Sequence, residues 1–181
     1  MIRLASSSLT RAKLLQSANI DFIQESVDFD EDSIFASTPK NFVYQATLGK
    51  YEANLRAFGY KDYPLLVADT VVTAHNQILR KAKDEDEARE ILMTQSASVT
   101  SIITCMIYQS PKIKLIDISS TDYVFEEFDL DDLNRFIDSG EWRGKAGACM
   151  VEGFCKKYIK EVRGNESTAM GLNTELLKRF I

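Results

Sequence analysis

A carboxylate and a hydroxyl lie in the middle of the most apolar stretch of this chain. Residues 65–72 read Leu-Leu-Val-Ala-Asp-Thr-Val-Val, which is typical of a buried strand, with Asp69 and Thr70 at its centre. An ionised carboxylate among apolar side chains is strongly destabilised unless a cation or hydrogen-bond donors meet it. Asp69 is therefore a candidate site residue. The alternative is that the strand ends at Ala68 and that Asp69 caps a turn.

A serine turn near the N-terminus is a candidate phosphate site. Three consecutive serines, Ser6–Ser8, follow a predicted strand at residues 2–5 and open a predicted helix. The free N–H groups and the positive dipole end of such a helix attract anions, and Arg11 and Lys13 add positive charge in its first turns. Serine runs also occur as plain capping turns, so this reading stays open at this point.

A lysine interrupts the apolar face of a second predicted helix. Thr38 and Pro39 are a strong helix start, and Gly59 stops the helix after Phe58. The expected buried stripe is Phe42, Val43, Ala46, Ala53 and Ala57. Lys50 lies between these apolar positions, so its ammonium group either faces a cleft or extends along the edge of the stripe to water.

The remaining segments alternate strand and helix signals. We expect, in order, a strand at 65–73, a helix capped by Asp84, strands at 99–108 and 112–125 joined as a hairpin at Pro111, a helix from Asp129 to Gly140, a strand at 158–162 and a last helix capped by Asn173. This alternation, without repeats or linkers, predicts one α/β domain with a mixed sheet.

Composition narrows the classes of function. A net charge of −5 without a basic arm argues against a nucleic-acid partner. The apolar stretch at the N-terminus is too short for a signal peptide, and no apolar run approaches membrane-spanning length. We therefore expect a cytoplasmic protein with no membrane partner.

Few residues offer thiol or imidazole chemistry. The three cysteines, Cys105, Cys149 and Cys155, show no CxxC spacing, so we expect reduced, buried thiols rather than a disulfide or a zinc site. The single histidine, His75, would have to serve any Ser-His-Asp triad alone, and it fits a loop residue better. Trp142 fits either a base-stacking residue or an edge contact.

Several segments, taken together and in order, resemble the Maf family. They are Leu4-Ala5-Ser6-Ser7-Ser8 with Arg11 and Leu14-Leu15, Ala68-Asp69-Thr70-Val71-Val72, Lys81, Gly140-Glu141 with Lys145-Ala146-Gly147-Ala148, and Gly171-Leu172. Each piece is common, but their order and spacing extend over nearly the whole chain. The resemblance implies a single α/β domain over residues 1–181, of the Maf/ITPase-like kind. Such a domain has a long mixed β-sheet flanked by helices and a deep cleft between two lobes.

The resemblance also implies a reaction. Members of the family are nucleoside triphosphate pyrophosphatases, in which water cleaves the α–β phosphate bond of a canonical or modified nucleotide with the help of Mg²⁺ or Mn²⁺. This house-cleaning activity releases a nucleoside monophosphate and diphosphate. By matching positions, Asp69 is the general base and Glu31 is an acidic residue linked to the metal; as a carboxylate, Asp69 could act as metal ligand, as base or as both. The positions that face the triphosphate are Ser7, Arg11, Lys50, Lys81 and Lys145. The nucleotide is the implied partner, and a homodimer is left open.

Physical chemistry makes these roles reasonable. In-line attack on a triphosphate places more negative charge on the leaving diphosphate, which fixed cations stabilise. A hard divalent cation takes oxygen ligands, which Asp69 and Glu31 offer. The alternative is that the lysines are solvated surface charges and that the acidic segment is only a loop. That segment contains Asp28, Asp30, Glu31 and Asp32.

Three residues at positions linked to the choice of nucleotide base do not all favour the same base. Thr10 stands where the family pattern has the first arginine of Ser-Pro-Arg-Arg, and Glu152 stands where pyrimidine-specific members have glutamine. A carboxylate only accepts hydrogen bonds, which suits a guanine edge better than a pyrimidine edge. Thr70 nevertheless matches the pyrimidine-specific subgroup, so the base is left open. At Arg80-Lys81-Ala82 the lysine of the family's Gly-Lys-Pro is kept and the proline is lost.

A function without catalysis is the competing hypothesis. The family is associated with septum formation and the arrest of cell division, which would suit a non-catalytic, nucleotide-binding regulator of cell division. Such a regulator would not need the carboxylates Asp69 and Glu31. Their presence favours the enzyme.

Overall fold

A computed structural model describes residues 1–31 and 34–181, so Asp32 of the acidic segment lies outside the described residues. The chain divides into two compact units. The first contains Met1–Thr70, Ile103–Ser120 and Asn165–Ile181, and the second contains Val71–Ile102 and Thr121–Gly164. None of the helices in the described part is long and apolar enough to cross a membrane.

The predicted mixed sheet is confirmed. Its strands are β1 (Ile2–Leu4), β2 (Phe22–Gln24), β3 (Leu65–Ala74), β4 (Gln77–Ile78), β5 (Val99–Gln109), β6 (Lys114–Phe125) and β7 (Ile159–Arg163). They follow the order β2-β1-β3-β5-β6-β7, and β4 pairs with β3. β1 runs parallel to β2 and β3, whereas β4 and β7 are antiparallel to their neighbours. The predicted hairpin corresponds to β5 and β6.

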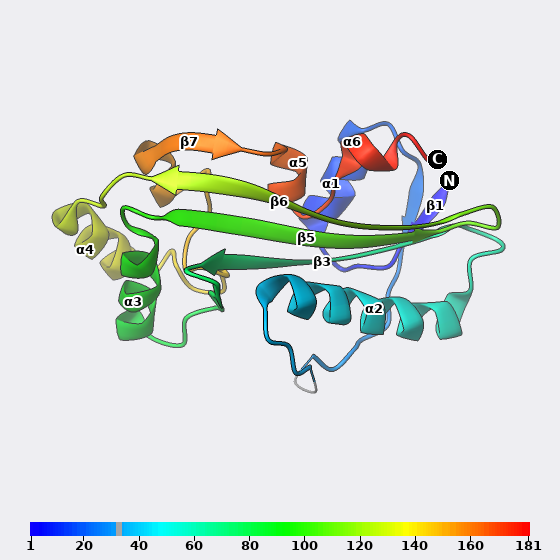
Figure 1. Cartoon of the computed structure of the whole chain (residues 1–181), viewed down its shortest axis with the longest axis horizontal. Coiled ribbons are helices and arrows are strands. Elements are labelled where there is room, and N and C mark those ends of the chain that lie inside the picture. The colour runs from blue at the N-terminus through cyan, green and yellow to red at the C-terminus, as the bar shows by residue number, and fades with distance from the viewer. Residues whose placement is uncertain (32–33) are drawn as a thin grey trace. The chain divides into compact units, whose positions relative to one another are not determined.

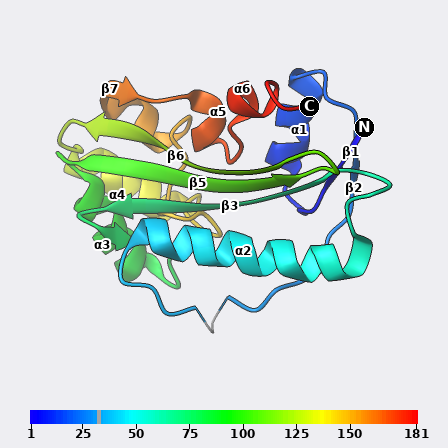
Figure 2. The same cartoon turned by 45° about the vertical axis from the view of Figure 1, so that its right-hand side comes forward.

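Helices cover both faces of the sheet in the first unit. α2 (Pro39–Phe58) lies along one face, while α1 (Leu9–Ser17) and α6 (Thr174–Leu177) lie on the other (Figures 1 and 2). Short α5 (Glu166–Ala169) precedes α6. The predicted caps are confirmed at Ser8, Thr38 and Asn173, whose side chains accept backbone N–H groups of their own helices. Gly59 ends α2 with a φ of 65°, which glycine adopts without strain.

The alternation of β3 decides where its polar residues point. Leu66 and Ala68 pack in the cluster that contains Leu15 of α1, whereas Leu65 and Val67 pack with Tyr51 of α2. Successive side chains of a strand face opposite sides of the sheet. Asp69 therefore faces α2 and Thr70 faces α1.

The buried stripe of α2 differs in part from the prediction. Its buried residues are Pro39, Phe42, Val43, Ala46, Thr47, Tyr51 and Asn54. Ala53 is half-buried and Ala57 is exposed, because Ala53 lies at the margin of the stripe and Ala57 lies in the last turn. At 100° per residue, Lys50 falls close to the centre of this stripe. Lys50 therefore faces inward.

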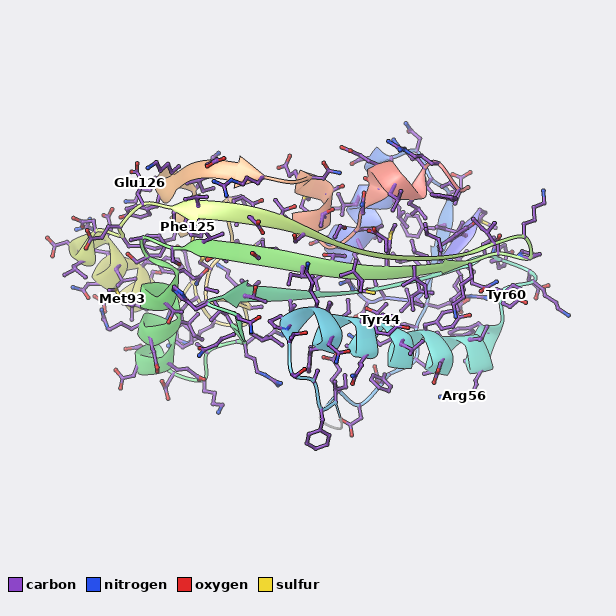
Figure 3. All side chains as sticks on the ribbon, in the orientation of Figure 1. Tyr44, Arg56, Tyr60, Met93, Phe125 and Glu126 are labelled. Carbon is purple, nitrogen blue, oxygen red and sulfur yellow. A yellow bond between two sulfur atoms is a disulfide. The ribbon has the colours of Figure 1, made fainter. Side chains whose placement is uncertain are left out.

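The second unit packs around aromatic rings. α3 (Glu85–Gln95) and α4 (Leu130–Ser139) begin at the predicted caps Asp84 and Asp129. The short 3₁₀ helix η1 (Phe154–Tyr158) contributes two rings to a cluster with Phe125, Phe128 and Phe136. Figure 3 marks Phe125 at the end of β6, with Glu126 next to it and Met93 on α3.

Two sequence expectations for this unit are wrong. Cys149 and Cys155 form a disulfide, which a separation of six residues without CxxC spacing did not indicate. The turn between them, in which Gly153 N–H donates to the Met150 carbonyl at 2.9 Å, brings the two residues together. Trp142 is buried and donates its indole N–H to the Ile137 carbonyl, so it is a core residue and neither stacks on a base nor makes an edge contact.

The remaining cysteine behaves as expected. Cys105 is a buried free thiol on β5. Burial raises its pKa to about 11, so the thiol stays protonated at neutral pH. Cys105 is therefore a small core residue rather than a reactive group.

Candidate active site

Three of the predicted site residues meet in the first unit. The Lys50 ammonium lies 2.6 Å from Oδ1 of Asp69 and 2.6 Å from Oε1 of Glu31. The side chain of Asp69 is only 12% exposed, so the lysine supplies the cation that this carboxylate requires. The alternatives of a solvated lysine and of a merely capping Asp69 are both excluded by this geometry.

The loop that carries Glu31 is fixed on α2. Asn54 accepts the N–H of Val27 at 3.0 Å and donates to the Lys50 carbonyl at 2.8 Å. The Phe29 ring packs directly on Gly49, where a Cβ atom would overlap the ring. Sequence reasoning missed these residues, although an asparagine and a glycine inside a helix were available signals.

Arg11 is held by three acceptors of its own unit. Nε donates to the Gly171 carbonyl at 2.9 Å, and the two terminal nitrogens donate to Ser6 Oγ at 3.0 Å and to Thr70 Oγ1 at 3.1 Å. Burial lowers the pKa of Arg11, and the negative charges of Asp69 and Glu31 oppose this shift. The structure thus places the guanidinium in the field of both carboxylates.

A pocket of about 310 Å³ adjoins these side chains. Its lining includes Ser6, Ser7, Ser8, Arg11, Glu31 and Lys50. Ser7 is exposed at its edge, whereas Thr10 is exposed and is not a lining residue. A larger groove, of about 760 Å³, lies elsewhere in the unit, but its charged lining residues are only Lys13 and Asp21. The smaller pocket is the better candidate, since its lining combines Glu31, the cations Arg11 and Lys50, and the serine turn that caps α1.

The second unit brings the two other predicted lysines together. Lys81 forms an antiparallel bridge with Ala146, so it lies beside Lys145 although 64 residues separate them in the sequence. Gly147, at a φ of 71°, donates to the carbonyls of Leu79 and Arg80. Lys81 is exposed and Lys145 is half-buried.

Glu152 belongs to the same unit as these lysines. It is exposed, in the turn that the disulfide closes. The predicted site residues therefore form two groups. Glu31, Lys50, Asp69 and Arg11 lie in the first unit, and Lys81 and Lys145 lie in the second.

The fold and the first group together define an α/β protein with an anion-binding pocket beside paired carboxylates. The chain belongs to the Maf-like protein family, whose family model matches residues 1–181.

Curated relatives carry a consistent name. A nucleoside triphosphate pyrophosphatase of a Nitratiruptor species is 56% identical over 179 residues, which cover 98% of this chain and 96% of the relative. Proteins of the same name are 37% identical over 183 residues in Campylobacter jejuni (serotype O:23/36, strain 81-176) and 37% over 172 residues in Helicobacter pylori (strain J99). The match to the Campylobacter protein covers 100% of this chain and 100% of that protein. The match to the Helicobacter protein covers 95% of this chain and 90% of that protein.

Proposed function

We propose that this chain hydrolyses the α–β phosphate bond of a nucleoside triphosphate and releases a nucleoside monophosphate and diphosphate. The observation that carries the proposal is the cluster of Glu31, Lys50 and Asp69 beside a pocket lined by Arg11 and the serine turn. The name shared by the relatives supports the same activity. A nucleotide is therefore the proposed partner, and we propose a cytoplasmic location and leave a homodimer open.

The paired carboxylates fit a divalent cation. Lys50 lies 2.6 Å from one oxygen of each, which indicates that the space between Glu31 and Asp69 favours positive charge. Mg²⁺ and similar ions take one or two carboxylates together with water and substrate phosphates. Among the described residues there is no group of three or more His, Cys, Asp or Glu that could hold a metal alone. We propose that Glu31 and Asp69 hold Mg²⁺ or Mn²⁺, which would neutralise and polarise the phosphates when bound.

We propose that Asp69 accepts the proton of the attacking water. Its Oδ1 receives the hydrogen bond from Lys50, while Oδ2 has no donor among residues 1–31 and 34–181. That second oxygen can take the proton of the attacking water, and the contact with Lys50 fixes its orientation. Lys50 also limits the repulsion between the two carboxylates.

The cations are the other half of the proposed mechanism. We propose that Arg11 and the serine turn before α1 bind phosphate oxygens, because both line the pocket. By family resemblance, Lys81 and Lys145 add positive charge where the leaving diphosphate develops negative charge. Thr10, Thr70 and Glu152 are proposed to influence the choice of base.

A panel of nucleotides tests the proposal. The chain, stripped of metal by a chelator, would be incubated with canonical and modified nucleoside triphosphates, with and without Mg²⁺ or Mn²⁺. We expect metal-dependent release of diphosphate with at least one nucleotide. Tight binding of nucleotides without turnover would overturn the proposal and support the non-catalytic regulator instead.

A further inference from the structure

A chain of hydrogen bonds leads from Arg11 into the interior of the first unit. Arg11 donates to Thr70 Oγ1 at 3.1 Å, and Thr70 Oγ1 lies 3.0 Å from Thr104 Oγ1 on β5. Thr104 is completely buried and donates to the Thr168 carbonyl at 2.7 Å. Thr104 is not one of the residues that line the pocket.

The direction of this chain is fixed by its inner end. The Thr168 carbonyl can only accept, so the single proton of the Thr104 hydroxyl is committed to it. Thr104 must therefore accept from Thr70, which commits the proton of Thr70 as well. Thr70 Oγ1 is left to Arg11 as an acceptor, which is what a guanidinium N–H requires.

The segment that supplies the Thr168 carbonyl is itself anchored. Ser119 donates to Asp117 at 2.9 Å, so it accepts from the Thr168 hydroxyl at 3.4 Å. Asn173 donates to the same oxygen of Asp117 at 3.2 Å. The segment also supplies the Gly171 carbonyl that accepts from Nε of Arg11.

This arrangement leaves part of the arginine for a ligand. A guanidinium has five N–H bonds, and three of those of Arg11 are directed to Ser6, Thr70 and Gly171. The other two have no acceptor within the described residues, and their direction is set by the three bonds that hold the group. We propose that Thr104 is a positioning residue for substrate binding: through Thr70 it orients Arg11 toward the triphosphate. This inference rests on the proposed function.

The test replaces Thr104 by valine, which removes the hydroxyl and keeps the shape of the side chain. Thr104→Val should lower kcat/KM by about tenfold, which corresponds to ~1.4 kcal/mol, with most of the change in KM because Arg11 contacts phosphate before and during the reaction. Thr104→Ser keeps the hydroxyl and should recover kcat/KM to within about threefold of wild type.

Thr47→Val is the matched control. Thr47 is also completely buried in the first unit, and its hydroxyl also donates to a backbone carbonyl, that of Val43, at 2.7 Å. Both valine variants should lower the melting temperature, but only Thr104→Val should raise KM. Equal KM values for the two variants and wild type would overturn the inference.

A double-mutant cycle tests whether Thr104 acts through Arg11. In an Arg11→Ala background, Thr104→Val should leave the Kd of a non-hydrolysable α,β-methylene nucleotide unchanged, whereas in wild type it should weaken binding by about tenfold. Equal weakening in both backgrounds would contradict the proposed route. Wild type that binds nucleotide without turnover would refute the proposed function, but the binding cycle would still decide the role of Thr104.

Discussion

Asp69→Asn separates the chemistry of this carboxylate from its contribution to stability. The side chain is 12% exposed and accepts a hydrogen bond from Lys50 at 2.6 Å. Asparagine has nearly the same shape and keeps an acceptor, and Glu31 still neutralises the lysine. We expect the free energy of unfolding to fall by only about 1 kcal/mol, as a charge-assisted bond becomes neutral. For a chain of this size that lowers Tm by roughly 2–4 °C.

Turnover should change far more than stability. An amide cannot accept the proton of the attacking water, and losing a general base costs about 10²–10⁴-fold in kcat. Diphosphate release at saturating nucleotide, measured beside a thermal melt, gives both quantities.

Asp132→Asn is the control for this experiment. Asp132, in the second unit, also accepts from a lysine, Lys157, and from the Tyr158 hydroxyl. Its replacement should lower Tm without lowering kcat. A folded Asp69→Asn protein with kcat within about threefold of wild type would show that Asp69 is not the base.

Four further substitutions test the other proposed roles. Lys81→Ala and Lys145→Ala should each lower kcat/KM by roughly ten- to a thousandfold with little change in Tm, and full activity in both would mean that they are surface charges. Glu152→Gln should shift kcat/KM toward dTTP and UTP by about 1–3 kcal/mol, because an amide both donates and accepts; an unchanged ratio to purine nucleotides would exclude base reading. Gly49→Ala should displace the loop that carries Glu31 and weaken Mn²⁺ binding by about tenfold despite alanine's higher helix propensity, and unchanged affinity would contradict this.

The pattern of β3 shows what sequence reasoning can predict. An apolar strand with Asp69 and Thr70 side by side must present them to opposite faces, and the interrupted stripe of α2 offered Lys50 as a partner for one of them. Local rules of this kind also predicted the helix caps, because a cap needs only a few neighbouring residues.

Contacts between distant segments left no comparable signal. Thr104 stands in a β-rich run where threonine is an ordinary strand residue, and nothing in that run indicates the Thr168 carbonyl 64 residues later. The bond between Cys149 and Cys155 likewise depends on the fold of the turn that joins them. Asp69 could be selected from its surroundings in the sequence, whereas the groups that orient Arg11 required the structure.

The identity of the bond that breaks is the most direct test of the central claim. ³¹P NMR of a single preferred nucleoside triphosphate, incubated with the wild-type chain and Mg²⁺ or Mn²⁺, resolves all phosphorus-containing products in one reaction. We predict that nucleoside monophosphate and inorganic diphosphate form in equal amounts. Formation of nucleoside diphosphate and orthophosphate instead would show cleavage at the β–γ bond and contradict the account.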